Sequence, residues 1–122
     1  MAKKFFDYII HGGDYNPDQW IRTPEIWDED MRLMKLAHIN SATVGVFSWA
    51  TLEPEEGVYN FEWLDEILDT IKENGIYVCM ATATAVQRTW MSKKYPEMLI
   101  TDFQGRKRKF GGRVNFCPNS EK

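Results

Sequence analysis

Three short apolar runs alternate along this chain with two amphipathic helical patterns, and that order restricts the folds open to it. The runs cover residues 8–13, 42–47 and 76–81, and the last continues to residue 84. Apolar residues dominate each run without strict alternation, which is typical of strands covered on both faces. The sequence therefore predicts three buried strands.

The segment between the first two runs has the pattern of a surface helix. Thr23 is a plausible N-cap, and Pro24 suits the first helical position. Apolar residues recur at spacings of four and three, forming one stripe: Trp27, Met31, Met34 and Ala37. Asn40 is the expected left-handed residue that ends this helix.

A second helix is predicted between the second and third runs. Asn60 can cap its first turn, and the pair Asn74-Gly75 is a stop signal. Its apolar face consists of Leu64, Ile67, Leu68 and Ile71. The opposite face is rich in charged residues, as expected for a helix that covers a sheet.

Strands joined by helical crossovers of this length run parallel and are connected with right-handed geometry. A doubly wound sheet and part of a (β/α)8 barrel both fit. The stretch HGGDYNP after the first run lacks the G-x-G-x-x-G pattern and the P-loop lysine, which disfavours a dinucleotide fold. The expected fold class is α/β, a partial TIM barrel with a long connection after the third strand, because a whole barrel needs about 250 residues.

Composition excludes several classes of protein. A hydrophobic content of 43% excludes a disordered chain, and a net charge of −3 argues against a general nucleic-acid partner. One basic run stands apart, comprising Arg106, Lys107, Arg108, Lys109 and Arg113. We interpret it as a solvated loop, with a phosphate patch and a role at a ligand site as the alternatives.

The N-terminal residues, the lengths of the apolar stretches and the cysteine count favour an intracellular protein. The first residues show no signal peptide, and no stretch is long enough to span a membrane, so no membrane partner is expected. Two cysteines do not make a disulfide framework. Cys79 lies in an apolar run and is expected to be a small buried side chain. These features predict a cytoplasmic location.

Polar and aromatic residues that follow the predicted strands are the candidate site, because barrels bind ligands at the carboxyl ends of their strands. They are Asp14, Tyr15, Asn16, Trp20, Ser48, Trp49, Glu53, Thr82, Thr84 and Trp90. The connection after the third strand extends to residue 119, and a connection of that length is usually functional.

Other chemistries find little support. His11 and His38 have no cysteine at ligand spacing, so no metal and no cofactor are assigned. No G-x-S-x-G elbow is present. Glu53, Glu55 and Glu56 lie in a turn rich in proline and glycine, and we interpret them as solvated. No catalytic pair of carboxylates is therefore predicted within the chain.

Several motifs occur in a fixed order along nearly the whole chain. They are YNPDQW at 15–20, FSWATLEPEEG at 47–57, FEWLD at 61–65, TATA at 82–85, WM at 90–91, YPE at 95–97, GR at 112–113 and CPNS at 117–120. This set resembles the start of the catalytic barrel of the glycoside hydrolase family 42 β-galactosidases. The resemblance covers residues 8–120, and the ordered set ending in R-x-x-x-C-P-x-S is its most specific part.

The resemblance implies retaining hydrolysis of terminal β-D-galactosyl residues by two glutamates. These glutamates lie at the ends of the fourth and seventh barrel strands, which fall beyond residue 122. Residues 1–122 are thus expected to be an N-terminal fragment of the catalytic domain, inactive alone. Arg113 matches a substrate-binding position whose guanidinium donates hydrogen bonds to galactose hydroxyls, with an arginine that only holds loop carbonyls as the alternative.

Two further positions are compared with the family. Cys117 matches a cysteine that binds structural zinc in some members together with three later cysteines, so no metal is assigned here. Residues 86–89 stand where the family usually carries proline, which bears on the rigidity of this connection and not on the family resemblance. Trp49 and Trp90 are either sugar platforms or inward-packed rings at the barrel rim.

Several interpretations of a chain of this length stay open. The gene is truncated, frame-shifted or split, or the sequence record is partial. The alternative functions are a non-catalytic carbohydrate-binding protein and a split-barrel scaffold. Three parallel strands leave two unpaired edges and one uncovered face. We therefore expect a homo-oligomer, or pairing with the missing C-terminal part of the barrel, besides a galactoside substrate.

Overall fold

The computed structural model describes residues 6–109, 111 and 116–120. The chain divides into two compact units. The sheet unit comprises residues 1–44 and 62–81, and the connection unit comprises residues 45–61 and 82–122. Each unit is described by itself.

A parallel three-stranded sheet is the centre of the sheet unit. Its strands are β1 (Gly12–Tyr15), β2 (Ser41–Val44) and β3 (Tyr77–Met80), in the order β1-β2-β3. Ser41 of β2 lies opposite Gly12 on one side and opposite Tyr77 on the other. The predicted succession of parallel strands is confirmed.

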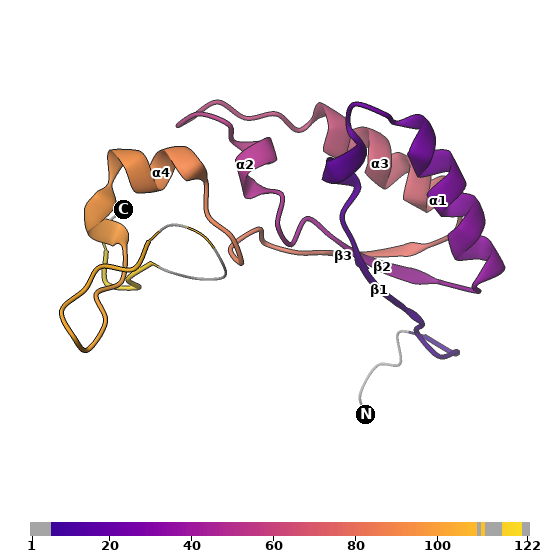
Figure 1. Cartoon of the computed structure of the whole chain (residues 1–122). Helices are drawn as coiled ribbons and strands as arrows, with labels where there is room; N and C mark the ends of the chain where they lie inside the picture. Colours follow the sequence, from indigo (N-terminus) through magenta and orange to yellow (C-terminus); the bar gives the residue numbers. More distant parts are fainter. Residues whose placement is uncertain (1–5, 110, 112–115, 121–122) are drawn as a thin grey trace. The chain divides into compact units, whose positions relative to one another are not determined.

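Two crossover helices lie on the same side of this sheet (Figure 1). They are α1 (Glu25–Leu36), which follows the 3-10 helix η1 (Pro17–Trp20), and α3 (Glu62–Glu73). One covered face is the arrangement of a (β/α) barrel, where helices surround the outside of the sheet. The α/β fold class predicted from the sequence, part of a TIM barrel, is confirmed.

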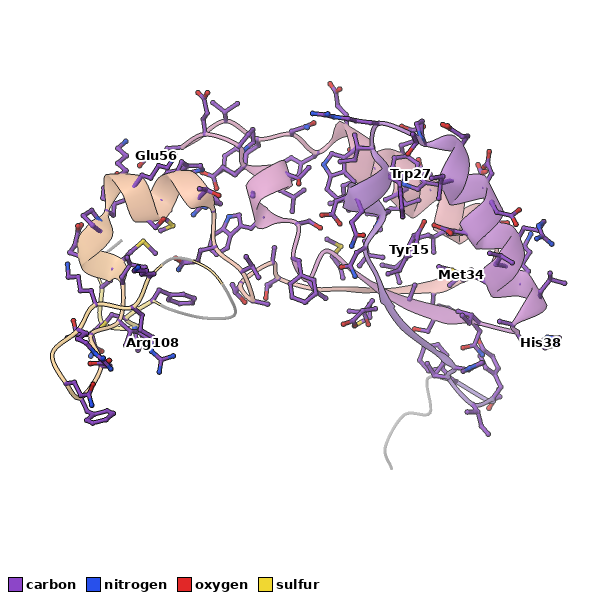
Figure 2. The ribbon with its side chains drawn as sticks, viewed as in Figure 1. Tyr15, Trp27, Met34, His38, Glu56 and Arg108 are labelled. Carbon is purple, nitrogen blue, oxygen red and sulfur yellow. The ribbon has the colours of Figure 1, made fainter. Side chains whose placement is uncertain are left out.

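The apolar stripe of α1 is buried at its centre. Trp27 and Met31 are buried, Met34 is half-buried and Ala37 is exposed. Trp27 also donates from Nε1 to the carbonyl of Pro17 at 3.1 Å, which fixes η1 against the helix. Figure 2 labels Trp27 and Met34 on this helix.

Tyr15, the last residue of β1, contacts α1 through its hydroxyl. That hydroxyl donates to Oδ2 of Asp30 at 2.9 Å. Burial and this hydrogen bond raise the pKa of Tyr15 above its ordinary value. The phenol therefore stays protonated and keeps joining strand to helix.

The ends of α1 differ from the sequence prediction. The N-cap is Pro24, without a side-chain cap, so Thr23 does not fill that role. The left-handed residue is His38, with φ of 56°, and not Asn40. The Asn40 amide is used elsewhere: it accepts from the His11 amide at 2.8 Å and donates to the carbonyl of Ile9 at 2.9 Å.

Helix α3 follows its prediction closely. Ile67 and Ile71 are fully buried, Leu64 is 7% exposed, and Leu68 is half-buried. Gly75 ends the helical segment with φ of +73°, a conformation that favours glycine.

The strands are shorter than predicted and covered on one side only. β1 begins at Gly12, so residues 8–11 precede it and Asp14 lies within the strand. A side chain at position 12 would place Cβ 1.6 Å from the carbonyl oxygen of Ser41, which requires glycine there. β1 is mostly exposed, and Cys79 in β3 is exposed as well. The predictions of strands covered on both faces and of a buried Cys79 are wrong, since the two helices cover one face.

The connection unit contains short helices and isolated bridges. Its helices are α2 (Trp49–Leu52), α4 (Thr89–Lys94) and the 3-10 helix η2 (Pro96–Met98). Bridges join Leu99 to Phe116 and Thr101 to Lys107. The long connection after β3 is therefore folded over much of its described length.

The described part of the basic run is solvated, as predicted. Residues 106–109 are exposed, and Figure 2 labels Arg108. Arg106 donates to Asp102 at 3.2 Å, and Lys107 donates from Nζ to the carbonyl of Pro96 at 3.2 Å. No helix among the described residues is long and apolar enough to cross a membrane.

Replacing Ile67 with alanine tests the core of the sheet unit. Ile67 is 0% exposed, so Ile67→Ala is expected to lower the free energy of unfolding by about 3 kcal/mol through lost burial and a residual cavity. Leu36→Ala, at a side chain that is 66% exposed, is the matched control and should cost far less. Equal shifts in urea midpoint for both variants would contradict this packing.

Acid should loosen the turn at Asp102. Its carboxylate accepts from the amides of Gln104 and Arg106, and these bonds hold its pKa below the ordinary value. Stability from a lowered pKa is present above the unfolded value and is lost as the pH falls through the folded value. The Gln104 and Arg106 amide signals in NMR spectra should therefore shift only below about pH 4. Asp102→Asn should remove this transition, and its persistence in that variant would disprove the assignment.

Candidate functional site

The candidate site is built around Glu53, the residue that follows α2. Its carboxylate accepts from the backbone amide of Gly57 at 3.0 Å and from Nε1 of Trp49 at 3.4 Å. Gly57 has φ of +76°, which favours glycine and lets the turn close on the carboxylate. Glu53 is only 5% exposed.

Arg88, the residue before α4, forms an ion pair with Glu53. Arg88 is 7% exposed, and this burial lowers the pKa of its guanidinium, which nonetheless stays charged. A second guanidinium nitrogen contacts the sulfur of Met91 at 3.4 Å. The pair joins the connection after β2 to the connection after β3, both within the connection unit.

Two tryptophan rings stack on the Arg88 guanidinium. Its Cζ atom lies 4.1 Å from the Trp49 ring centroid and 4.7 Å from the Trp90 ring centroid. Trp90 also donates from Nε1 to the carbonyl of Glu53 at 2.9 Å. Cation–π contacts of this kind are stronger when the cation is withdrawn from water. The rings therefore stabilise the same charge that Glu53 neutralises.

A second, exposed group of charges lies in the same unit. Lys94 forms an ion pair with Glu56, and the hydroxyl of Tyr95 donates to Glu56 at 2.9 Å. The hydrogen bond to Glu56 raises the pKa of the Lys94 ammonium. This group holds α4 against the turn that contains Glu56.

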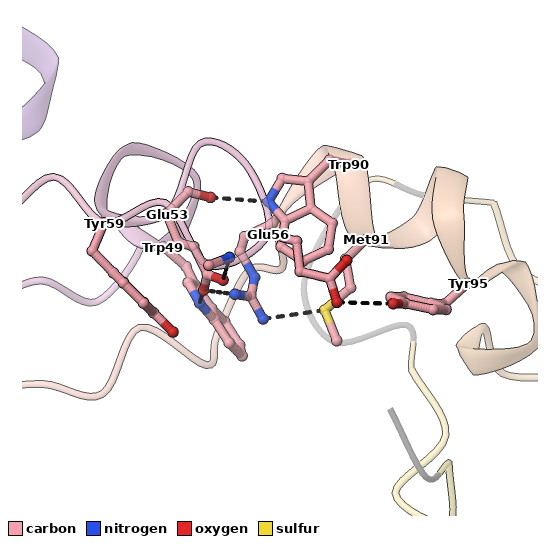
Figure 3. A pocket seen from close by; sticks show the side chains of 9 residues that line it. Trp49, Glu53, Glu56, Tyr59, Trp90, Met91 and Tyr95 are labelled. Atoms are coloured by element: carbon pink, nitrogen blue, oxygen red, sulfur yellow. Dashed lines mark hydrogen bonds and ion pairs between the residues drawn. The ribbon is translucent and has the colours of Figure 1, made fainter.

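These groups surround a hollow of about 580 Å³ (Figure 3). Its lining is aromatic and polar: Trp49, Glu53, Glu56, Gly57, Tyr59, Arg88, Trp90, Met91 and Tyr95. Every one of these residues belongs to the connection unit. The volume is in the ordinary range of small-molecule sites.

The structure corrects the interpretation of Glu53. A solvated turn was predicted for Glu53, Glu55 and Glu56, and the last two are exposed as expected. Glu53 is buried instead, because Arg88 lies against it and removes the cost of an isolated charge. No local sequence signal pairs the two residues, although Arg88 belongs to residues 86–89, the segment that departs from the family pattern.

Arg88 also keeps the backbone conformation that proline would impose. Its φ is −69° and its ψ is 134°, while the proline ring fixes φ near −65°. Here the ion pair and the stacked rings restrain a residue that has no ring of its own. The connection is therefore held by side-chain contacts.

The other residues predicted for the site differ in burial and in the unit to which they belong. Ser48 is fully buried, and its hydroxyl finds no hydrogen-bond partner among the described residues. Thr82 and Thr84 are exposed. The candidates Asp14, Tyr15, Asn16 and Trp20 belong to the sheet unit. Arg113 lies outside the described residues.

Residues 6–109, 111 and 116–120 contain no candidate metal site. No group of three or more histidine, cysteine, aspartate or glutamate side chains gathers there. Cys117 is half-buried with a free thiol, and its amide donates to the carbonyl of Met98 at 2.6 Å. Glu53 forms an ion pair with Arg88, and Glu56 forms one with Lys94. Neither carboxylate is therefore available as a general acid or a nucleophile.

Parallel strands with crossover helices on one face are the arrangement of part of a (β/α)8 barrel. The sequence profile of the family described as Beta-galactosidase, glycoside hydrolase family 42, matches residues 14–122. The chain belongs to this family.

Similar proteins extend well beyond the matched region. The beta-galactosidase BgaP of a Planococcus species is 62% identical over 112 residues, covering 92% of this chain and 16% of that protein. The solved structure of a catalytic mutant of a GH42 beta-galactosidase from G. stearothermophilus is 50% identical with a TM-score of 0.92, covering 96% of this chain and 17% of that one. A cold-adapted beta-galactosidase from a Rahnella species gives the same TM-score at 43% identity, with coverage of 96% and 17%. The chain thus spans about one sixth of these relatives.

Breaking the buried Arg88–Glu53 ion pair should lower the free energy of unfolding more than breaking the exposed Lys94–Glu56 pair. Arg88→Met leaves the Glu53 carboxylate buried and uncompensated, so unfolding free energy should fall by about 3 kcal/mol. Adding Glu53→Gln should recover much of this loss, because the amide oxygen can still accept from Gly57. Unfolding is followed by near-ultraviolet circular dichroism of the tryptophans.

The control is Lys94→Met, which breaks the exposed pair with Glu56 and should change stability little. An Arg88→Met protein as stable as the unmodified chain would show that the buried pair is not formed.

Proposed function

We propose that residues 1–122 form the N-terminal part of the catalytic TIM-barrel domain of a retaining β-galactosidase, which hydrolyses terminal β-D-galactosyl residues in carbohydrate metabolism. The observation that carries this proposal is the family match over residues 14–122. Relatives that are 62% and 49% identical over this region are named as beta-galactosidases. A separate carbohydrate-binding protein or scaffold receives no comparable support.

The catalytic glutamates are proposed to lie in the longer part of the protein that the relatives possess. Retaining hydrolysis needs two carboxyl groups about 5 Å apart, one as acid and one as nucleophile. Glu53 and Glu56 instead serve as partners of Arg88 and Lys94. Residues 1–122 alone are therefore expected to be inactive.

Arg113 is proposed to bind the galactosyl ring. A guanidinium offers five donors in a planar fork, which suits neighbouring sugar hydroxyls. The basic residues 106–109 are solvated, so within the basic run we assign the sugar to Arg113.

The proposed partners are a galactoside substrate and either the remaining part of the barrel or a further copy of the chain. Exposed apolar side chains in the sheet unit, Tyr77 and Met80 in β3, support a protein partner for that unit. A cytoplasmic location is proposed on the basis of two free cysteines.

A chimeric enzyme tests this proposal. This chain replaces the matched segment of the Planococcus beta-galactosidase, and hydrolysis of a nitrophenyl β-D-galactoside is measured. The chimera should be active, and residues 1–122 alone should not. Arg113→Ala in the chimera should lower kcat/KM about a hundredfold, because a charged donor to the sugar is lost.

Arg106→Ala is the matched control, since Arg106 is an exposed arginine of the same basic run. It should leave kcat/KM unchanged. A folded but inactive chimera, or equal activities for the two alanine variants, would contradict the proposal.

A further inference from the structure

We infer that Arg88 is a positioning residue for galactoside hydrolysis: its ion pair with Glu53 fixes the connection after β3 against the connection after β2. The choice of this reaction rests on the proposed function. Both connections follow parallel strands, and barrel enzymes build their active sites from such connections. Arg88 is assigned no contact with the sugar, and it acts through the connection that it holds.

Three contacts join the two connections at this point. Arg88, in the connection after β3, forms a buried ion pair with Glu53, in the connection after β2. The Arg88 guanidinium also stacks on Trp49, with Cζ 4.1 Å from the ring centroid. Trp90 donates from Nε1 to the carbonyl of Glu53 at 2.9 Å. Replacing Arg88 removes the first two of these contacts and leaves the third.

A further link between the same connections is weaker. Lys94 pairs with Glu56, and their side chains are 56% and 44% exposed. Exposed ion pairs contribute little, because water screens the two charges. The buried pair is therefore the stronger restraint.

Hydrogen bonds extend the restraint from Arg88 along the connection after β3. The carbonyl of Arg88 accepts from the Met91 amide at 3.1 Å, and the carbonyl of Met91 accepts from the Tyr95 amide at 2.8 Å. The Met98 amide donates to the carbonyl of Tyr95 at 3.1 Å. The carbonyl of Met98 accepts from the Cys117 amide at 2.6 Å, where the chain returns after the basic run. Because Met91 and Met98 are buried in close packing, a displacement at Arg88 should reach residue 117.

A proline at position 88 would supply only part of this restraint. Proline fixes its own φ near −65°, close to the −69° of Arg88. It has no side-chain group that can pair with Glu53. Mutation can therefore separate the backbone conformation of this residue from the link between the connections.

The first test measures rate and stability together in the chimeric enzyme described above. Arg88→Met should lower kcat about tenfold and leave KM nearly unchanged, because misplaced groups destabilise the transition state more than the bound substrate. Adding Glu53→Gln should restore much of the free energy of unfolding without restoring kcat, since the neutral pair does not rejoin the connections. Arg88→Pro, which keeps the backbone conformation, should be as slow as Arg88→Met. Arg88→Lys keeps a cation for Glu53 and should recover part of kcat.

Arg32→Met is the matched control, because Arg32 forms an exposed ion pair with Glu29 in the sheet unit. It should leave both kcat and KM unchanged. The inference is overturned if kcat recovers together with stability when Glu53→Gln is added to Arg88→Met. Full kcat in Arg88→Pro would also overturn it, since the backbone conformation would then be sufficient.

The second test needs no enzymatic activity. In NMR spectra of the 122-residue chain, Arg88→Met with Glu53→Gln should shift the Cys117 amide signal and speed its exchange with solvent. The amide signal of Ile71, in α3 of the sheet unit, should not move. An unmoved Cys117 signal would overturn the inference even in an active chimera. An inactive unmodified chimera would contradict the proposed function, and the Cys117 signal would then decide the positioning inference separately.

Discussion

Burying a carboxylate or a guanidinium away from water is unfavourable unless an opposite charge lies beside it. In the connection unit Glu53 and Arg88 form such a buried ion pair. Both side chains are almost fully buried, and each makes further stabilising contacts besides the ion pair. The Gly57 amide donates to the carboxylate, and two indole rings stack on the cation. The hollow and its lining are arranged around this pair, so the candidate site depends on it.

Features set by local periodicity could be predicted from the sequence, and features set by distant contacts could not. The apolar face of α3 and its glycine stop follow from a single stretch of chain. The start of β1 at Gly12 depends instead on close approach to Ser41, and the burial of Glu53 depends on Arg88 far along the chain. The same reason explains why Cys79 was misjudged: an apolar run does not reveal how many faces of its sheet are covered.

The family resemblance and the physics of the site address different questions. The resemblance predicted the family, which the comparisons confirm, and it directed attention to Arg113. It marked residues 86–89 only as a departure from proline. The structure gives that departure a physical meaning, since Arg88 has a backbone conformation close to that of proline and a side chain that joins two connections. A segment that departs from the family pattern therefore contributes Arg88 to the centre of the described site.

The most direct test of this account is the exchange of the Arg88 guanidinium protons with solvent, measured by NMR. A buried, paired guanidinium should give slowly exchanging signals at neutral pH, with nuclear Overhauser contacts to the rings of both Trp49 and Trp90. Rapid exchange like that of the exposed Arg22, without contacts to either ring, would show that the pair does not organise the site.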